Sequence, residues 1–271
     1  FVGPYTLTQD DIVSGGHFED AVAYGGWTLD DHNPGGFMNK GLASIEYKVN
    51  QGYGIPFDCL YSVNVPNLMF AGRNISCSHM AFSGTRVMAT CALIGQAVGT
   101  AADMILDKET TPAGLRANHI KELQDALEDA DCMLPYRWRK VSPLTLAAKT
   151  KPENEPMRNG IDREWNGEDN GVYTAPGEVN LTYTWAKPVT VSDARFIFDS
   201  DLKVRSKRMR KLEATTERKE MPSEMVKAFK VQVRVPAATR KQSKLNAADP
   251  AAGEWVTVAE VKDNFRRLVK L

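Results

Sequence analysis

The feature that most constrains the fold is a stretch of small and apolar residues, 85–106, which carries no charged side chain between Arg86 and Asp103. Its length and spacing predict one helix. A helix that is apolar on all sides is normally buried. Its alanines and glycines would let a large neighbour approach the backbone closely. On composition alone, a structural core helix is the favoured interpretation.

The residues before this helix suggest a more specific role. Residues 68–71 form a short apolar run that ends at Gly72, which is typical of a buried strand leading into a loop. Residues 83–85 suit the start of a helix. The first turn of a helix has unpaired N–H groups and a partial positive charge, and Arg86 would add a full charge. Such a tip suits an anion or an electron-rich ring edge.

Residues 68–102, LMFAGRNISCSHMAFSGTRVMATCALIGQAVGTAA, resemble the C-terminal flavin-binding segment of a family of FAD-dependent oxidoreductases. The upstream stretches LTQDDIVSGGHFEDAVAYGGWTLDDHNPGG and YGIPFDCLYSVNVPNL resemble the same family. These proteins are glutathione-reductase-like flavoproteins, distantly related to fumarate reductase flavoproteins. The resemblance extends over residues 5–135 and implies FAD as the cofactor.

The resemblance also implies cofactor-binding positions. Gly72 and Arg73 stand where related flavoproteins have a Gly-Asp pair that touches the ribityl chain. Because Arg73 departs from that pattern, we expect it to contact phosphate or ribityl hydroxyls. A reduced flavin gathers negative charge near N1 and the C2 carbonyl, so a helix tip there favours reduction. The positions implied at this tip are Gly84, Thr85, Arg86, Val87, Met88 and Ala89.

Three side chains are the expected catalytic residues: His79, Arg86 and His32. The resemblance implies that both histidines border the substrate cavity. An imidazole can donate or accept a proton near neutral pH, although a structural histidine is the alternative for each. We expect His79 or Arg86 to handle a proton or a negative charge during hydride transfer between flavin and an unknown small-molecule substrate. A carbohydrate-related compound is one candidate.

A complete enzyme of this type needs a Rossmann unit with a GxGxxG motif. This sequence has none, because Gly15-Gly16 and Gly25-Gly26 lack the spacing. We therefore expect the chain to be the C-terminal portion of a larger protein, as a fragment or a processed form. Its expected partner is a missing N-terminal Rossmann segment that holds the FAD adenosine and pyrophosphate. With the true N-terminus expected elsewhere, both a cytoplasmic and an exported location stay open.

Charge changes along the chain and suggests two domains. Residues 1–140 carry 10 Lys and Arg against 16 Asp and Glu, whereas residues 141–271 carry 24 against 18. We expect a multidomain α+β protein. Its first domain, 1–140, would be the C-terminal part of an FAD-binding α/β domain, and its second, 141–271, an antiparallel β-sandwich of the jelly-roll type. Alternating runs predict strands in this second domain at residues 179–185, 194–198, 229–235 and 255–261.

A second resemblance gives an alternative function. The stretches NGIDR, WNG and LTYTW resemble discoidin-like, galactose-binding-like modules. The chain would then be a carbohydrate-binding or polysaccharide-processing protein without redox activity, with a sugar stacked on Trp165. A core tryptophan beside a solvated turn is the favoured alternative. The polar groups expected in this loop are Asn166, Glu168 and Asp169.

Other partners and sites are not expected. The formal net charge is zero, which argues against nucleic-acid binding. The basic run 203–211 is better explained as a solvated hairpin loop than as a phosphate or acidic-glycan patch. No uninterrupted run of about 18 apolar residues is present, so we expect no membrane span. The four cysteines lack CxxC spacing, and we expect no metal site.

Overall fold

The structure is a computed structural model that describes residues 1–165, 171–172, 174–175, 177–200, 225–236 and 253–271. These residues divide into two compact units, 1–182 and 183–271, which are considered separately. The expected domain boundary, after residue 140, therefore falls inside the first unit.

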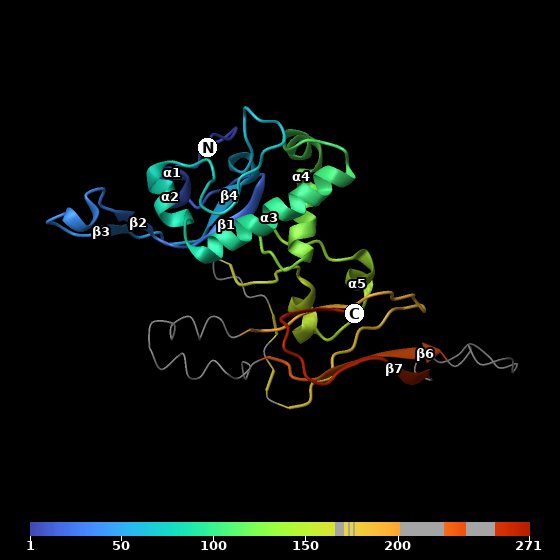
Figure 1. Ribbon diagram of the computed structural model, residues 1–271. Coiled ribbons are helices and arrows are strands. Elements are labelled where there is room, and N and C mark those ends of the chain that lie inside the picture. Colours follow the sequence, from blue (N-terminus) through green and yellow to red (C-terminus); the bar gives the residue numbers. More distant parts are fainter. Residues whose placement is uncertain (166–170, 173, 176, 201–224, 237–252) are drawn as a thin grey trace, which may run out of the picture. The chain divides into compact units, whose positions relative to one another are not determined.

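The first unit mixes helices with short antiparallel strands. Its helices are α1 (Gln9–Val13), α2 (His79–Thr85), α3 (Met88–Asp107), α4 (Pro112–Asp129) and α5 (Pro143–Ala147). Its 3-10 helices are η1 (Gly36–Met38), η2 (Phe57–Cys59) and η3 (Pro152–Arg158). Its strands are β1 (Ala21–Gly25), β2 (Leu29–His32), β3 (Ser44–Tyr47) and β4 (Tyr53–Pro56). Strand β1 pairs with β4 and β2 with β3, and the β2–β3 hairpin projects from this unit (Figure 1).

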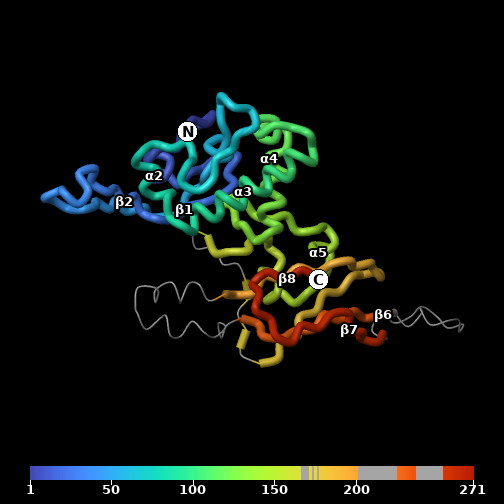
Figure 2. The backbone as a smooth tube through the Cα atoms, viewed as in Figure 1, coloured from blue at the N-terminus to red at the C-terminus, as the bar shows by residue number. Residues whose placement is uncertain are grey.

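The core of the first unit lies where α3 and α4 pack against each other and against β1 (Figure 2). Apolar side chains at helical spacing on α4 face inward, as its sequence predicts. The largest fully buried side chains of the unit include Tyr53, Phe57, Ile55, Ile94, Leu115, Leu123 and Leu127. All four cysteines are free, and Cys59 and Cys132 are buried.

The helix predicted over residues 85–106 is α3, and a separate short helix, α2, precedes it. Helix α2 begins where the Ser78 hydroxyl accepts a hydrogen bond from the backbone N–H of Ala81, and Arg86 is its C-cap. Val87 follows in an extended conformation, φ −73° and ψ 149°, and α3 starts after it. The predicted start was wrong, because residues 83–85, which suit the start of a helix, form the last turn of α2.

Helix α3 has one packed face and one open face. Ile94, Ala97 and Ala101 lie in the core, whereas a Cβ atom added at Gly95 or Gly99 would meet nothing within 4 Å. Among the described helices, α3 is the one whose length and composition would let it cross a membrane, although polar residues interrupt its apolar run. Core helices of soluble proteins meet the same criteria.

The remaining sequence predictions for this unit had mixed outcomes. The helical spacing of apolar residues predicts a helix over 115–130, which is α4, and alternation over 43–49 predicts a strand, which is β3. Residues 57–62 also suit a short strand, but that prediction is wrong, because the backbone N–H of Leu60 donates to the Phe57 carbonyl and closes a 3-10 turn. Residues 68–71 contribute only an isolated antiparallel bridge, between Met69 and Tyr61.

The second unit contains two antiparallel strand pairs in its described residues. Strand β5 (Arg195–Ile197) pairs with β8 (Leu268–Lys270), and β6 (Phe229–Pro236) pairs with β7 (Gly253–Val261). Three of the four predicted strand regions are therefore confirmed, while residues 179–185 form no strand among the described residues. Two-stranded sheets do not show the expected jelly-roll sandwich. The basic run 203–211 lies outside the described residues.

A buried ion pair joins α4 to the loops around the β1–β4 pair. The Asp20 carboxylate, in a residue only 4% exposed, accepts a hydrogen bond from the backbone N–H of Asp58 at 3.0 Å. Its Oδ2 lies 3.2 Å from Nε of Arg116, and the same nitrogen lies 3.2 Å from the Asp58 carboxylate. Burial raises the pKa of Asp20 above its ordinary value of 3.8, and the Asp58 charge adds to this, although Arg116 opposes it.

The raised pKa of Asp20 predicts how stability depends on pH. The folded protein keeps the Asp20 proton at pH values where the unfolded chain has lost it. The contribution of Asp20 to the free energy of unfolding therefore falls as the pH rises from 3.8 through the raised value. In urea titrations, Asp20→Asn should gain stability relative to wild type over this range. If wild type instead gained stability relative to Asp20→Asn as the pH rises, the attraction between Asp20 and Arg116 would outweigh the effect of burial on the Asp20 carboxylate.

The glycines of the first unit should respond to alanine in opposite directions. A Cβ at Gly25 would lie 2.4 Å from the ring of the fully buried Tyr53. Gly25→Ala should lower the free energy of unfolding by about 1–3 kcal/mol, as overpacked cores do. Gly99→Ala, on the open face of α3, should raise it by about 0.5–1 kcal/mol through helix propensity. Equal changes in unfolding free energy for Gly25→Ala and Gly99→Ala would contradict the conclusion that Gly25 is tightly packed and Gly99 faces open space.

Candidate functional site

The start of α3 offers backbone donors to a ligand. Its N-cap, Val87, makes no side-chain hydrogen bond to the first turn. Met88 is 90% exposed, and Ala89 is also exposed. The first N–H groups of a helix have no acceptor within the helix, and they carry its positive dipole end. The first turn of α3 can therefore receive the electron-rich edge of a ligand.

The loop before α2 adds a cationic side chain. Gly72 has φ +72°, in the left-handed region that favours glycine, and a Cβ there would meet nothing within 4 Å. The exposed Arg73 that follows holds its guanidinium carbon 5.0 Å from the centre of the Phe82 ring on α2. This cation–π contact ties the loop to α2 and leaves the guanidinium at the surface.

Two of the predicted cofactor-binding residues lie beneath the surface. Gly84 and Thr85 are buried in the last turn of α2. A Cβ added at Gly84 would lie 3.0 Å from the Tyr53 hydroxyl and 3.3 Å from a methyl of Leu29. Gly84 therefore limits how closely α2 packs on the β-strands, while Arg73, Met88 and Ala89 are the exposed members of the predicted set.

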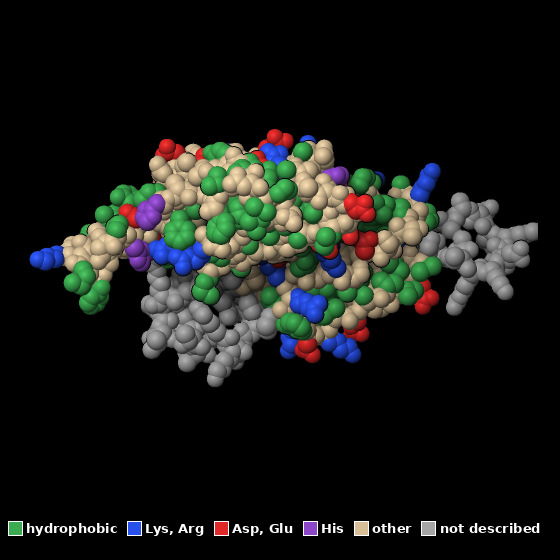
Figure 3. Space-filling view, turned by 45° about the horizontal axis from the view of Figure 1, so that its top comes forward, with side chains coloured by type: hydrophobic (Ala, Val, Ile, Leu, Met, Phe, Trp, Pro, Cys, Tyr) green, Lys and Arg blue, Asp and Glu red, His purple; other side chains and the backbone are tan. Residues whose placement is uncertain are grey.

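The structure brings the three predicted catalytic residues together around β2. Nη2 of Arg86 donates to the carbonyl of Asp30 at 3.0 Å and to its carboxylate at 3.2 Å. Nε2 of His32 lies 3.0 Å from the same carboxylate. Nε2 of His79 lies 3.0 Å from the carboxylate of the next residue, Asp31. Figure 3 shows histidine side chains beside acidic and basic ones on one face of the molecule.

Sequence reasoning missed the two aspartates that organise this group. Asp30 and Asp31 lie on β2, and the contacts between β2 and α2 bridge about 50 residues of sequence. The available signal was the run LDDH, in which two carboxylates directly precede His32. Among the described residues, no group of three or more His, Cys, Asp or Glu is arranged to hold a metal ion. Acid–base work is the chemistry that these groups support.

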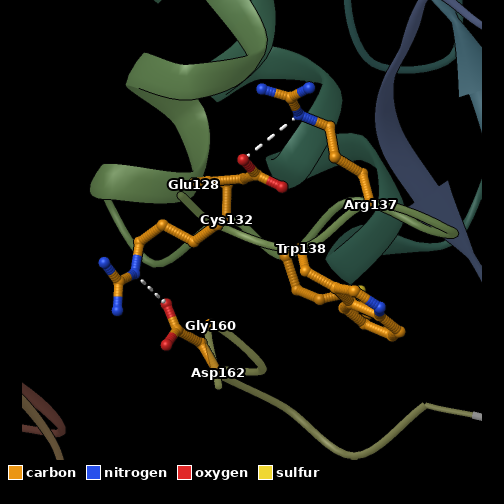
Figure 4. Close-up of a pocket in the computed structure, with 8 residues that line it drawn as sticks. Glu128, Cys132, Arg137, Trp138, Gly160 and Asp162 are labelled. Carbon is orange, nitrogen blue, oxygen red and sulfur yellow. Dashed lines mark hydrogen bonds and ion pairs between the residues drawn. The ribbon is translucent and has the colours of Figure 1, made fainter. Parts of the chain in front are cut away.

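A small pocket lies elsewhere in the first unit, and none of the predicted site residues lines it. Figure 4 shows the side chain of Arg137 directed at Glu128, with 3.1 Å between Nε and the carboxylate. Arg139 and Asp162 form a second ion pair at 3.1 Å. Burial raises the pKa of Glu128, although the Arg137 charge opposes this effect. These ion pairs connect α4 to the segment that follows it. Because none of the predicted site residues lines the pocket, it is not the candidate site.

Trp165 belongs to the core side of the first unit. The residue is 9% exposed, and its ring packs edge-on against Tyr24 and Tyr136, with centroids 6.0 and 5.8 Å apart. A buried ring offers no face to a sugar, so the core interpretation holds. The neighbouring Asn166, Glu168 and Asp169 lie outside the described residues.

The exposed first turn of α3 therefore lies close in sequence to Arg86, which belongs to the group of acidic, basic and imidazole side chains around β2. Residues 1–127 match the family described as FAD dependent oxidoreductase. The match covers just under half of the chain and is to a family of enzymes that use FAD, so the cofactor is FAD. No curated protein and no solved structure gives a significant match.

The residues present fit this cofactor. The uncapped first turn of α3 presents N–H donors, which suit the acceptor-rich pyrimidine edge of an isoalloxazine ring. Gly72 leaves space for close approach, and Arg73 supplies a cation for phosphate or hydroxyl groups. Thus exposed donors, open space and positive charge lie along one segment of the chain.

The pocket arginine should matter for stability. Arg137→Met would remove the cation whose Nε lies 3.1 Å from the carboxylate of Glu128, a residue that is 4% exposed. Breaking a buried ion pair in this way lowers the free energy of unfolding by about 3–5 kcal/mol. We expect about 2–3 kcal/mol here, because Arg137 is partly exposed. Lys140→Met, at an exposed pair with Asp125, is the control and should change stability by less than about 0.5 kcal/mol. Equal losses of unfolding free energy in the two variants, measured by urea unfolding, would contradict a stabilising role for the Arg137–Glu128 pair.

Proposed function

We propose that this chain supplies the isoalloxazine-facing part of an FAD-dependent oxidoreductase of the glutathione-reductase-like type. One observation carries the proposal: the three predicted catalytic side chains converge on Asp30 and Asp31, and Arg86 is separated from α3 by one residue. The match over residues 1–127 supports the cofactor. We further propose hydride transfer involving a small-molecule substrate as the reaction.

The cofactor would be held by exposed groups at the α2–α3 junction. The backbone N–H groups of Met88 and Ala89 would donate to the pyrimidine edge, and Arg73 would contact ribityl hydroxyls or phosphate. Gly84 and Thr85 would act indirectly, by fixing the depth at which α2 packs. When bound, FAD supplies the acceptor or donor of the hydride.

The side chains on the substrate side have distinct roles in this proposal. Arg86 carries a positive charge and is held by two contacts to Asp30, so it would stabilise negative charge on the substrate or cofactor edge. His79 is 70% exposed and would exchange a proton with the substrate. His32, on the other side of Asp30, is a second proton carrier at the same site.

Two further parts of the proposal concern partners. Because the sequence has no GxGxxG motif, we propose that a separate Rossmann segment holds the adenosine and pyrophosphate. The substrate class stays open, since burial of Trp165 removes the observation that favoured a sugar. We propose neither nucleic acid nor membrane as a partner.

A charge placed at the helix tip tests the cofactor site. In the full-length protein, Met88→Glu would set a carboxylate against the electron-rich ring edge, while an acidic residue in the first turn of α3 favours the helix itself. FAD should bind about tenfold more weakly, with no loss of thermal stability. The readout is FAD affinity by equilibrium titration of flavin fluorescence.

The control for this test is Gln96→Glu, which adds the same charge on the exposed side of α3, two turns further along. It should bind FAD as wild type does. Wild-type binding by Met88→Glu would contradict the placement of the ring edge. If the purified full-length protein shows no flavin absorbance even after FAD is added, the proposed function is wrong.

A further inference from the structure

We infer that Asp31 is a positioning residue that holds His79 in a single tautomer, with Nδ1 as its proton-accepting nitrogen. A carboxylate has only hydrogen-bond acceptors, so the ring nitrogen that faces it must carry hydrogen. The facing nitrogen is Nε2 of His79, 3.0 Å from Oδ1 of Asp31. In the neutral ring, Nδ1 then has a lone pair and no hydrogen. The inference rests on the proposed function for its catalytic meaning.

The surroundings of the pair support a dedicated role for Asp31. Adjacent residues of a strand direct their side chains to opposite faces. Asp30 accordingly receives Arg86 and His32, whereas Asp31 faces His79. The Asp31–His79 contact joins β2 to α2 across 48 residues of sequence. With side chains 70% and 26% exposed, the pair adds little to stability, so its value lies in orientation.

The proton chemistry that follows is simple. A proton leaving the substrate would bond to the Nδ1 lone pair of His79 and give an imidazolium. The positive charge would then lie against the Asp31 carboxylate, which stabilises it. Return of the proton to the substrate restores the neutral ring with hydrogen on Nε2. The Nδ1 lone pair forms the new N–H bond and the electron pair of the broken bond stays on the substrate, so this step involves no oxidation or reduction and needs no further reactant.

The chain contains an internal comparison. On α4, Nδ1 of His119 lies 2.6 Å from the carboxylate of Glu122, so that ring presents its other nitrogen to a carboxylate. The same reasoning gives His119 hydrogen on Nδ1 and a lone pair on Nε2. The two histidines should therefore be opposite tautomers in one protein.

Nitrogen NMR of the protein with ¹⁵N-labelled histidine tests the inference. The chain has four histidines, and His79→Gln identifies the signals of His79 by their loss. At about pH 8.5, well above the ordinary imidazole pKa, wild-type His79 should show hydrogen on Nε2 and a bare Nδ1. His119 should show the reverse. Asp31→Ala should turn His79 into a tautomer mixture, with an unchanged melting temperature.

The control variant is Glu122→Gln, which removes the carboxylate that faces His119. It should change the His119 signals and leave those of His79 as in wild type. Hydrogen on Nδ1 of His79, or a tautomer mixture in the wild type, would overturn the inference. So would a His79 spectrum that Asp31→Ala leaves unchanged.

A second readout separates this inference from the proposed function. The NMR result needs neither FAD nor substrate, so a wild-type protein that fails to bind FAD would sink the proposed function without altering the tautomer. Because Asp31 does not hold the cofactor, Asp31→Ala should bind FAD within about twofold of wild type in the same fluorescence titration. A much larger loss would assign Asp31 to cofactor binding and overturn its role as a positioning residue.

Discussion

The contact between Arg86 and Asp30 connects the α2–α3 junction to strand β2, and the other side chains of the candidate site are arranged around it. Arg86 is the C-cap of α2, and α3 begins two residues later, so the guanidinium anchors the junction of the two helices to β2. The exposed N–H donors at the start of α3 therefore lie close in sequence to that anchor. The same carboxylate also faces His32, so one residue links the charge at the helix junction to an imidazole. Loss of this contact would free the junction and the histidine together.

The presence of a helix at this site could be predicted from the sequence, but the residue at which it starts could not. A charge-free run of small residues indicates a buried helix, and α3 is such a helix on one of its faces. Its start could not be predicted from the residues alone, because Ser83 and Thr85 are good N-terminal residues that here lie in the last turn of α2. The choice is made by packing, since Gly84 must face Tyr53. Tertiary contacts thus decided between two locally acceptable starting points.

The histidines and Arg86 could be selected from the sequence, because their residue types carry acid–base and anion-binding chemistry. The aspartates could not be selected in the same way, since an aspartate on a short polar strand is usually a solvated side chain. What distinguishes Asp30 and Asp31 is pairing between β2 and α2, which joins residues about 50 positions apart. Such pairing depends on the fold and leaves no spacing pattern in one sequence.

The glycines show how one residue type serves opposite purposes in neighbouring elements. Gly25 and Gly84 enclose the buried Tyr53 ring, and a Cβ at either position would crowd it. Gly95 and Gly99 face open space on α3. At Gly25 and Gly84 the space that a side chain would need is occupied by Tyr53, so packing requires glycine there. At Gly95 and Gly99 helix propensity alone would favour alanine.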